Sequence, residues 1–263
     1  MPVDLAADLN FAHQLADSAG AVSLSYFRRE IGRWSKADGS LATDGDLATE
    51  DHLRERIARE RPGDSMLGEE RGQTGDGRRR WIIDAIDGTI QFAAGSPHWG
   101  TLIALEVDGR VVVGMCDQPA HGRRYWATRG GGAFVAQPAS GAAAKLSVTG
   151  ARELSSARSY VPPSEFQPNA RARQVAALVS GATRQQPHED HPALQVATGG
   201  FELAIWLRAG PWDLAAPALI VEEAGGRFTN IDGRSDFTTG TALFSNGHLH
   251  EAVLALIQRS GGQ

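Results

Sequence analysis

The sequence has almost no cysteine: Cys116 is the single one among 263 residues. An intramolecular disulfide is therefore excluded, and a reducing compartment such as the cytoplasm fits this composition best. Cys116 lies in an apolar segment with strand character, so a role as a catalytic nucleophile is a weak alternative.

The chain also lacks an excess of positive charge and any long apolar run. It has 26 Lys and Arg against 31 Asp and Glu, a formal net charge of −5. A general nucleic-acid binder needs a basic surface for its phosphate contacts, so this class is disfavoured. No segment approaches the roughly 18 consecutive apolar residues of a membrane span. The first twenty residues carry early aspartates and do not resemble a signal peptide. We therefore expect neither nucleic acid nor membrane as a partner.

The remaining composition is typical of a globular protein, with 41% hydrophobic and 22% charged residues. Apolar spacing predicts helices over about 4–28 and 47–59, and strands over 65–68, 81–83, 101–107, 111–116 and 124–128. Residues 136–144 are rich in Ala, Pro, Ser and Gly and predict a linker. After it, helices expected over 171–179, 214–224 and 250–258 alternate with strands over 201–207 and 242–245. We therefore expect an α+β half over 1–138, with an antiparallel sheet and most of the acidic motifs described next, and an α/β half over 139–263 that supplies Asp213.

Two aspartates follow a short apolar segment, Trp81-Ile82-Ile83. Asp84 and Asp87 are three residues apart at its end. Burying two uncompensated carboxylates together is costly, so such a pair usually needs a cation. Gly88 permits a sharp turn beside them, and Thr89 adds a hydroxyl.

Two further acidic positions follow the same logic. Glu69 and Glu70 come after the apolar segment 65–68, and Asp213 lies just before an Ala- and Leu-rich predicted helix. Oxygen ligands without cysteine or paired histidine favour Mg²⁺ or Mn²⁺ over zinc. Each position alone also fits a turn, a helix cap or a solvated loop; their combination favours a metal site.

These motifs resemble those of the inositol monophosphatase family. The family's three ordered motifs correspond here to Gly68-Glu69-Glu70, to Asp84 through Phe92, and to Trp212-Asp213 continuing to Gly226; Lys36, Thr43 and Asp46 match an earlier segment. The resemblance runs from the first predicted helix to the last. It implies a layered αβαβα sandwich, of mixed α+β and α/β character, and a homodimer.

The resemblance also implies the roles of the site residues. Glu69, Asp84 and the carbonyl of Ile86 would hold one Mg²⁺; Asp84, Asp87 and Asp213 would hold a second, and a weaker third ion would lie near Glu69. Thr89, linked to Asp46, would position the attacking water, with Glu69 acting through its metal. The backbone N–H groups of Gly88 and Thr89 would hold the phosphate. The substrate would be a small phosphate monoester hydrolysed without a covalent intermediate.

Two positions depart from the family pattern. Ala85 replaces the usual proline and Gln91 the usual asparagine. Since proline would fix φ, we expect Ala85 to reduce the rigidity of the turn while keeping the metal-binding side chains.

The substrate is indicated less directly. The segments 61–70 and 125–134 look most like actinobacterial histidinol-phosphate phosphatases, whereas 196–200 is similar to inositol monophosphatases. Asp87, Glu189, Trp206 and Asp213 are the expected substrate contacts. Trp206 stands where the family commonly has an acidic residue, and an indole accepts no hydrogen bond from a substrate hydroxyl.

Several alternatives therefore stay open. Glu189 could pair with an amine, as in histidinol phosphate or an amino sugar phosphate, and Trp206 could stack on an imidazole, a nucleobase or a sugar. The segment 188–191 could equally be a solvated loop, and a zinc site from His188 and His191 has no nearby histidine or cysteine to complete it. Histidinol phosphate is the leading substrate. The alternatives are an inositol, sugar or nucleotide-type monophosphate, including one of specialised metabolism, and a catalytically silent, metal-binding regulatory homodimer.

Overall fold

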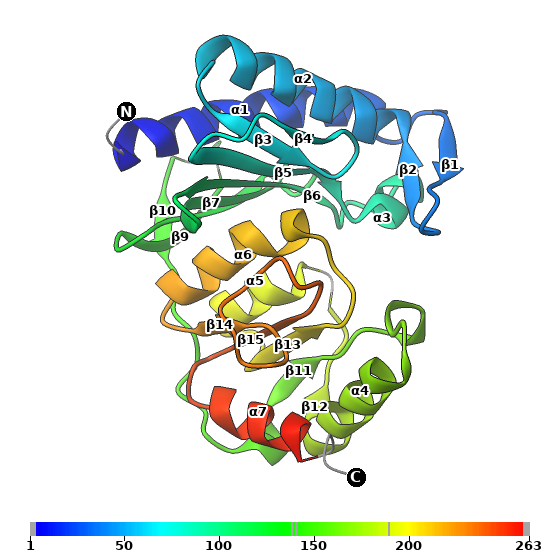
Figure 1. Ribbon diagram of the computed structural model, residues 1–263, viewed down its shortest axis with the longest axis vertical. Helices are drawn as coiled ribbons and strands as arrows, with labels where there is room; N and C mark the ends of the chain where they lie inside the picture. The colour runs from blue at the N-terminus through cyan, green and yellow to red at the C-terminus, as the bar shows by residue number, and fades with distance from the viewer. Residues whose placement is uncertain (1–3, 138, 140, 189, 260–263) are drawn as a thin grey trace.

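The structure, a computed structural model, describes residues 4–137, 139, 141–188 and 190–259. It contains five layers, in which a helix pair, an eight-stranded sheet, a second helix pair, a five-stranded sheet and a third helix pair follow one another (Figure 1). The predicted αβαβα architecture is confirmed.

The helix pair of the first layer is formed by the first two helices of the chain (Figure 1). The helices are α1 (Leu5–Tyr26), α2 (Asp44–Glu60), α3 (Thr89–Ala93), α4 (Ala170–Ala182), α5 (Pro192–Ala197), α6 (Pro211–Glu223) and α7 (His250–Gln258). Among the described helices, none combines the length and the apolarity needed to cross a bilayer.

The large sheet has the strand order β10-β9-β8-β7-β6-β5-β3-β4. Its members are β3 (Ser65–Gly68), β4 (Gly72–Thr74), β5 (Arg79–Asp87), β6 (Gly100–Val107), β7 (Arg110–Gln118), β8 (Arg123–Thr128), β9 (Gly132–Ala136) and β10 (Ala143–Lys145). All neighbours are antiparallel except β3 and β5, which run parallel. Because the two strands run parallel, Glu69, which follows β3, and Asp84, near the end of β5, lie at the same end of the sheet. A separate hairpin joins β1 (Arg33–Ser35) and β2 (Leu41–Thr43).

The small sheet has the strand order β12-β11-β13-β15-β14 and mixes parallel with antiparallel pairs. Its members are β11 (Arg158–Tyr160), β12 (Arg184–Gln185), β13 (Leu203–Trp206), β14 (Arg227–Thr229) and β15 (Ala242–Ser245).

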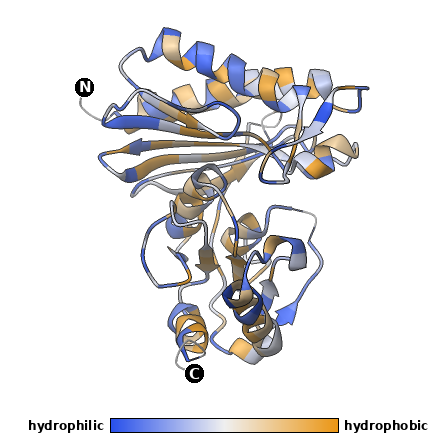
Figure 2. Cartoon of the chain, turned by 45° about the vertical axis from the view of Figure 1, so that its right-hand side comes forward, coloured by the Kyte–Doolittle hydropathy of each residue, from blue (hydrophilic) through white to orange (hydrophobic). Residues whose placement is uncertain are grey.

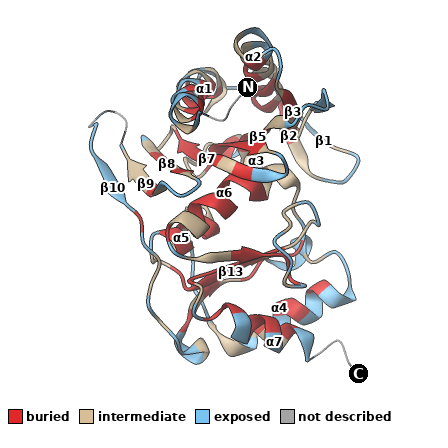
Figure 3. Ribbon diagram, turned by 60° about the vertical axis from the view of Figure 1, so that its left-hand side comes forward, coloured by how far each residue is buried: buried red, intermediate tan, exposed pale blue. Residues whose placement is uncertain are grey.

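Helix α6 joins the two sheets. It packs against β6, β7 and β8 on one side and against β14 and β15 on the other. Every residue from Leu214 to Val221 is buried, as expected for a helix segment that is apolar all round (Figure 3). Helix α1 instead buries one face, including Phe11 and Leu15, against the large sheet, while its other face is polar (Figure 2). The core therefore fixes the start of α6 relative to the large sheet.

The predicted helices and strands are found, with two corrections that concern the site. The segment expected to stop at Ile83 is part of β5, which continues to Asp87. Asp213 lies inside the first turn of α6 and not before it. The division between residues 138 and 139 stays a prediction. Strand β10, at one edge of the large sheet, lies beyond that boundary and overlaps the end of the segment expected to be a linker.

Candidate functional site

Strand β5 presents the first two carboxylates. Its apolar residues are buried, and its register with β6 shifts between Asp84 and Asp87. The Asp84 carboxylate accepts a hydrogen bond from the Ile86 N–H at 3.0 Å. The Thr101 hydroxyl donates to the Ala85 carbonyl at 2.8 Å. These two bonds restrain the irregular segment at the position where proline is replaced by Ala85.

Two other elements bring carboxylates to the same place. Glu69 follows β3, whose last residue, Gly68, pairs with Ile83 of β5. Asp213 in the first turn of α6 accepts a hydrogen bond from the Gly210 N–H at 2.6 Å. Glu69, Asp84 and Asp213 each offer one oxygen, and these atoms all lie within 4.8 Å of one another. Three acidic residues far apart in the sequence thus converge in space.

Mutual repulsion and burial perturb these carboxylates. Burial, followed by the charges of Glu69, Asp87 and Asp213, raises the pKa of Asp84 well above its ordinary value. Burial raises the pKa of Asp87 to about 6. Burial and the charges of Asp87 and Glu69 raise the pKa of Asp213 to about 8. Such a group of carboxylates is stabilised in its charged form by a cation.

One lysine lies beside the group. Lys36 Nζ is 2.5 Å from Glu69 Oε1 and 2.7 Å from Glu70 Oε1. Burial nevertheless raises the pKa of Glu69 to about 7, against the lowering effect of Lys36. A single ammonium therefore leaves the carboxylates incompletely neutralised. Hard oxygen donors that meet at this spacing fit a divalent cation of the Mg²⁺ or Mn²⁺ type.

Asp87 lies near this group but outside its tightest part. Its Oδ2 is 3.9 Å from His191 Nε2, and its charge acts on both Asp84 and Asp213. The carbonyl oxygen of Ile86 accepts a hydrogen bond from the Thr89 hydroxyl at 3.2 Å. The division of these ligands between two ions stays a prediction.

Thr89 and Asp46 meet as the resemblance implied. Gly88 adopts φ 85° and caps α3, whose first residue is Thr89. The Thr89 hydroxyl lies 3.1 Å from Asp46 Oδ1. The other carboxylate oxygen of Asp46 accepts hydrogen bonds from the N–H (2.8 Å) and the hydroxyl (2.5 Å) of Thr43 at the start of α2. Asp46 is thus held rigidly while it contacts Thr89.

The expected substrate contacts are placed only in part. Glu189 lies outside the described residues. Trp206 ends β13, and one face of its ring is stacked on His191, with ring centroids 5.3 Å apart and planes at 22°. Tyr160 and His188 extend this aromatic group, with centroids 4.7 Å apart. His191, which caps α5, therefore connects the aromatic group with Asp87.

Sequence reasoning missed one residue that shapes the site, Glu50. Its carboxylate is fully buried and accepts hydrogen bonds from the N–H groups of Glu70 (2.7 Å) and Arg71 (3.0 Å), and from Arg54 (2.7 Å). It thus anchors the segment that carries Glu69. The available signal was its position four residues after Asp46, on the same face of α2.

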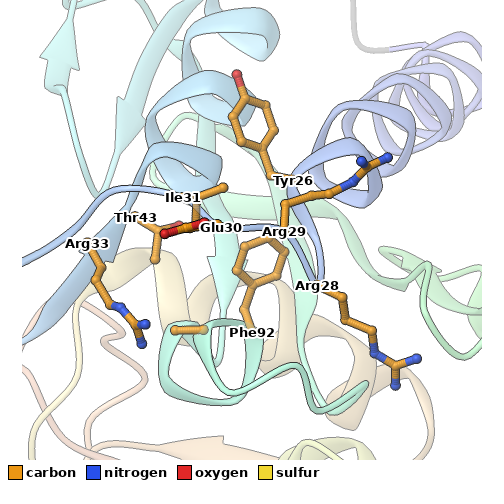
Figure 4. Close-up of a pocket in the computed structure, with 9 residues that line it drawn as sticks. Tyr26, Arg28, Arg29, Glu30, Ile31, Arg33, Thr43 and Phe92 are labelled. Atoms are coloured by element: carbon orange, nitrogen blue, oxygen red, sulfur yellow. The ribbon is translucent and has the colours of Figure 1, made fainter.

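A pocket at the end of α1 lies apart from the carboxylates. Figure 4 shows Phe92 between Arg28 and Arg33. The pocket is lined by Tyr26, Arg28, Arg29, Glu30, Ile31, Arg33, Thr43, Phe92 and Ala93. None of the candidate metal ligands contributes to it, so it is not the site of the chemistry described above.

Known proteins resemble this chain over nearly its whole length. Residues 4–261 match the model of the inositol monophosphatase family. A relative from Streptomyces coelicolor named histidinol-phosphatase is 38% identical, covering 96% of this chain and 97% of that protein. A relative of the same name from Mycobacterium tuberculosis is 40% identical, covering 94% and 96%. A solved structure, titled an IMPase of Thermotoga maritima, is 26% identical with a TM-score of 0.81, covering 96% and 97%.

Proposed function

Since the chain belongs to the inositol monophosphatase family and is a phosphoric monoester hydrolase, we propose that it hydrolyses histidinol phosphate to histidinol with Mg²⁺. The observation that carries the site assignment is the convergence of Glu69, Asp84 and Asp213 beside the Thr89–Asp46 pair. The relatives named histidinol-phosphatase support the substrate, because they match this chain over nearly its whole length.

The proposed metal ligands are Glu69, Asp84, the carbonyl of Ile86, Asp87 and Asp213. Two or three divalent ions bound there would neutralise the phosphate and activate a water for attack on phosphorus. Lys36 forms ion pairs with both Glu69 and Glu70. The lysine side chain would therefore move away from Glu69 when a cation binds there. Mn²⁺ is the alternative ion, since it uses the same oxygen ligands.

Thr89 and Asp46 are proposed to position the attacking water, together with Glu69. A hydroxyl has one proton, and when Thr89 donates it to Asp46 the threonine oxygen is left as an acceptor. The threonine oxygen would then accept a hydrogen bond from the attacking water, and so orient the water and help to remove its proton. The hydrogen bonds from Thr43 keep the Asp46 carboxylate in place during this step.

The turn that follows β5 is proposed to hold the phosphate. Gly88 adopts the left-handed conformation and directly precedes Thr89, the first residue of α3. The N–H groups of Gly88 and Thr89 would bind phosphate oxygens while the charge on the transferred group develops. A side chain at Gly88 would meet the His98 carbonyl oxygen at 3.1 Å, so glycine also suits this position sterically.

The aromatic group supports an imidazole-bearing substrate. Tyr160, His188, His191 and Trp206 form a continuous set of ring contacts that reaches Asp87. Flat rings pack favourably against aromatic side chains, whereas the indole of Trp206 accepts no hydrogen bond from a cyclitol hydroxyl. Asp87 and Asp213 are also proposed to contact the ester end of the substrate. Glu189 is retained as the proposed partner of the substrate amine.

The test is phosphate release with Mg²⁺ from histidinol phosphate, inositol 1-phosphate, a sugar phosphate and a nucleoside monophosphate. We expect kcat/KM for histidinol phosphate to exceed the others by at least about tenfold, which corresponds to about 1.4 kcal/mol of differential transition-state binding. Preferential turnover of inositol 1-phosphate would overturn the substrate while keeping the reaction class. Failure to turn over any phosphate monoester would favour the silent regulatory role.

A homodimer in a reducing cytoplasm is proposed as the working form of the enzyme. The buried Cys116 and the absence of a second cysteine are compatible with reducing conditions. Sedimentation of the full chain would show the dimer directly. A histidine-biosynthetic role follows from the proposed substrate, and growth of a histidinol-phosphatase-deficient strain expressing this chain would test it.

A further inference from the structure

A second group of side chains of the types that ligate metals lies apart from the carboxylates. His98 precedes β6, His121 lies in the turn between β7 and β8, and Asp190 lies just before α5. His98 Nδ1 and His121 Nε2 are 3.1 Å apart. One ligand atom from each of the three residues lies within 4.8 Å of the other two. Three segments separated by 23 and 69 residues therefore bring two imidazoles and a carboxylate together.

We propose that His98, His121 and Asp190 form a second cation site, which binds one divalent ion of the Zn²⁺ type. In tetrahedral zinc, bonds of about 2.0–2.1 Å place two ligating nitrogens about 3.3 Å apart. The nitrogens of His98 and His121 are already close to that separation. Small side-chain rotations would complete three protein ligands and leave a fourth position for water.

The carboxylate of Asp190 is held in a manner suited to a ligand. Its Oδ2 is 2.9 Å from Arg123 and 3.3 Å from Gln195. Both contacts use the same oxygen, so Oδ1 has no hydrogen bond within the described part of the chain. Hydrogen bonds of this kind orient metal-binding carboxylates. The charge of Arg123 opposes a cation, and we therefore expect moderate affinity.

The two sites differ in their donor atoms. The first group offers carboxylate oxygens, which suit Mg²⁺, whereas imidazole nitrogens suit zinc, copper and nickel. The histidine site was not expected from the sequence, where His188 and His191 lacked a third histidine. In space, His98 and His121 approach the same segment. They meet Asp190, which lies between His188 and His191 in the sequence.

The alternative is a hydrogen bond between two neutral imidazoles, for which 3.1 Å is also an ordinary distance. The two cases are separated by titrating the full chain with Zn²⁺ in saturating Mg²⁺, in competition with a chromophoric chelator. The wild type should bind one equivalent of Zn²⁺ under these conditions. His98→Gln and His121→Gln should each weaken binding at least about tenfold, the lower end of the range for lost metal-site interactions.

Two control variants make the result specific. His248→Gln removes an exposed histidine that is not a member of the group, and Asp213→Asn alters the carboxylate site; both should bind Zn²⁺ as the wild type does. A Zn²⁺-dependent rise in the Tm of the wild type, reduced in His98→Gln, gives a second readout on folded protein. The proposal is overturned if the wild type binds no Zn²⁺ in saturating Mg²⁺. It is also overturned if Zn²⁺ binding is lost in Asp213→Asn but kept in His98→Gln and His121→Gln.

Discussion

Replacing Glu50 with Gln tests whether the carboxylate site depends on a residue outside the candidate metal ligands. Glu50 is fully buried between Arg54 and the backbone of Glu70 and Arg71, with three hydrogen bonds of 2.7–3.0 Å. It also packs on Gly68, where a side-chain carbon would come within 2.3 Å of its Oε1. The segment that carries Glu69 is thus attached to α2 through this one side chain.

The magnitude follows from the partners that are lost. Glutamine has only one oxygen acceptor, so at least one of the N–H donors loses its partner. The hydrogen bond of Arg54 also loses its charged acceptor. A buried donor without a partner costs about 1–3 kcal/mol, and a charged hydrogen bond contributes about 1.5–3 kcal/mol. We therefore expect Glu50→Gln to lower the free energy of unfolding by about 2–4 kcal/mol. Residues that orient metal ligands typically change metal affinity 10- to 100-fold. The Mg²⁺ concentration for half-maximal activity should rise accordingly.

The matched control is Glu106→Gln. Glu106 is also buried and paired with an arginine, Arg80, on the same sheet, but it contacts none of the candidate ligands. Urea denaturation should show a loss of stability in both variants. Only Glu50→Gln should change the Mg²⁺ dependence of phosphate release measured below the unfolding transition. If both variants show the same Mg²⁺ dependence, Glu50 is a structural residue without influence on the site.

Two further predictions concern Asp213 and His250. Asp213→Asn should reduce kcat by several orders of magnitude while metal-free unfolding shows no loss of stability, because one of several repelling buried carboxylates is removed; normal turnover would exclude Asp213 from the metal site. His250 lies fully buried between Ser245 and Thr229, and burial lowers its pKa from 6.5 to about 4. Since the folded state binds this proton less tightly than the unfolded state, stability should fall as the pH falls from 6.5 to 4, by about 3 kcal/mol from this group. Urea unfolding at several pH values checks this, because His250→Gln should lack that part of the decline; an equal decline in both proteins would contradict it.

Much of the fold was predictable because helices and strands depend on residues that are near one another in sequence. The apolar spacing of α1 and the uniformly apolar α6 determine which faces are buried. The acidic positions were also visible, since Asp84 and Asp87 accompany a buried strand and Glu69 follows another. The pattern failed at boundaries, because the hydrogen bonds of β6 extend β5 through Asp87.

By itself, the sequence determined the set of acidic residues and, through the family that its motifs resemble, the order of the layers. Only the tertiary structure decided that Lys36 pairs with Glu69 and that Glu50 accepts a hydrogen bond from the backbone of Glu70. The same holds for the convergence of His98, His121 and Asp190. The physical reason is that these contacts join residues between 20 and 92 positions apart. Their distances are set by strand register and by the packing of helices on sheets, which local periodicity does not encode.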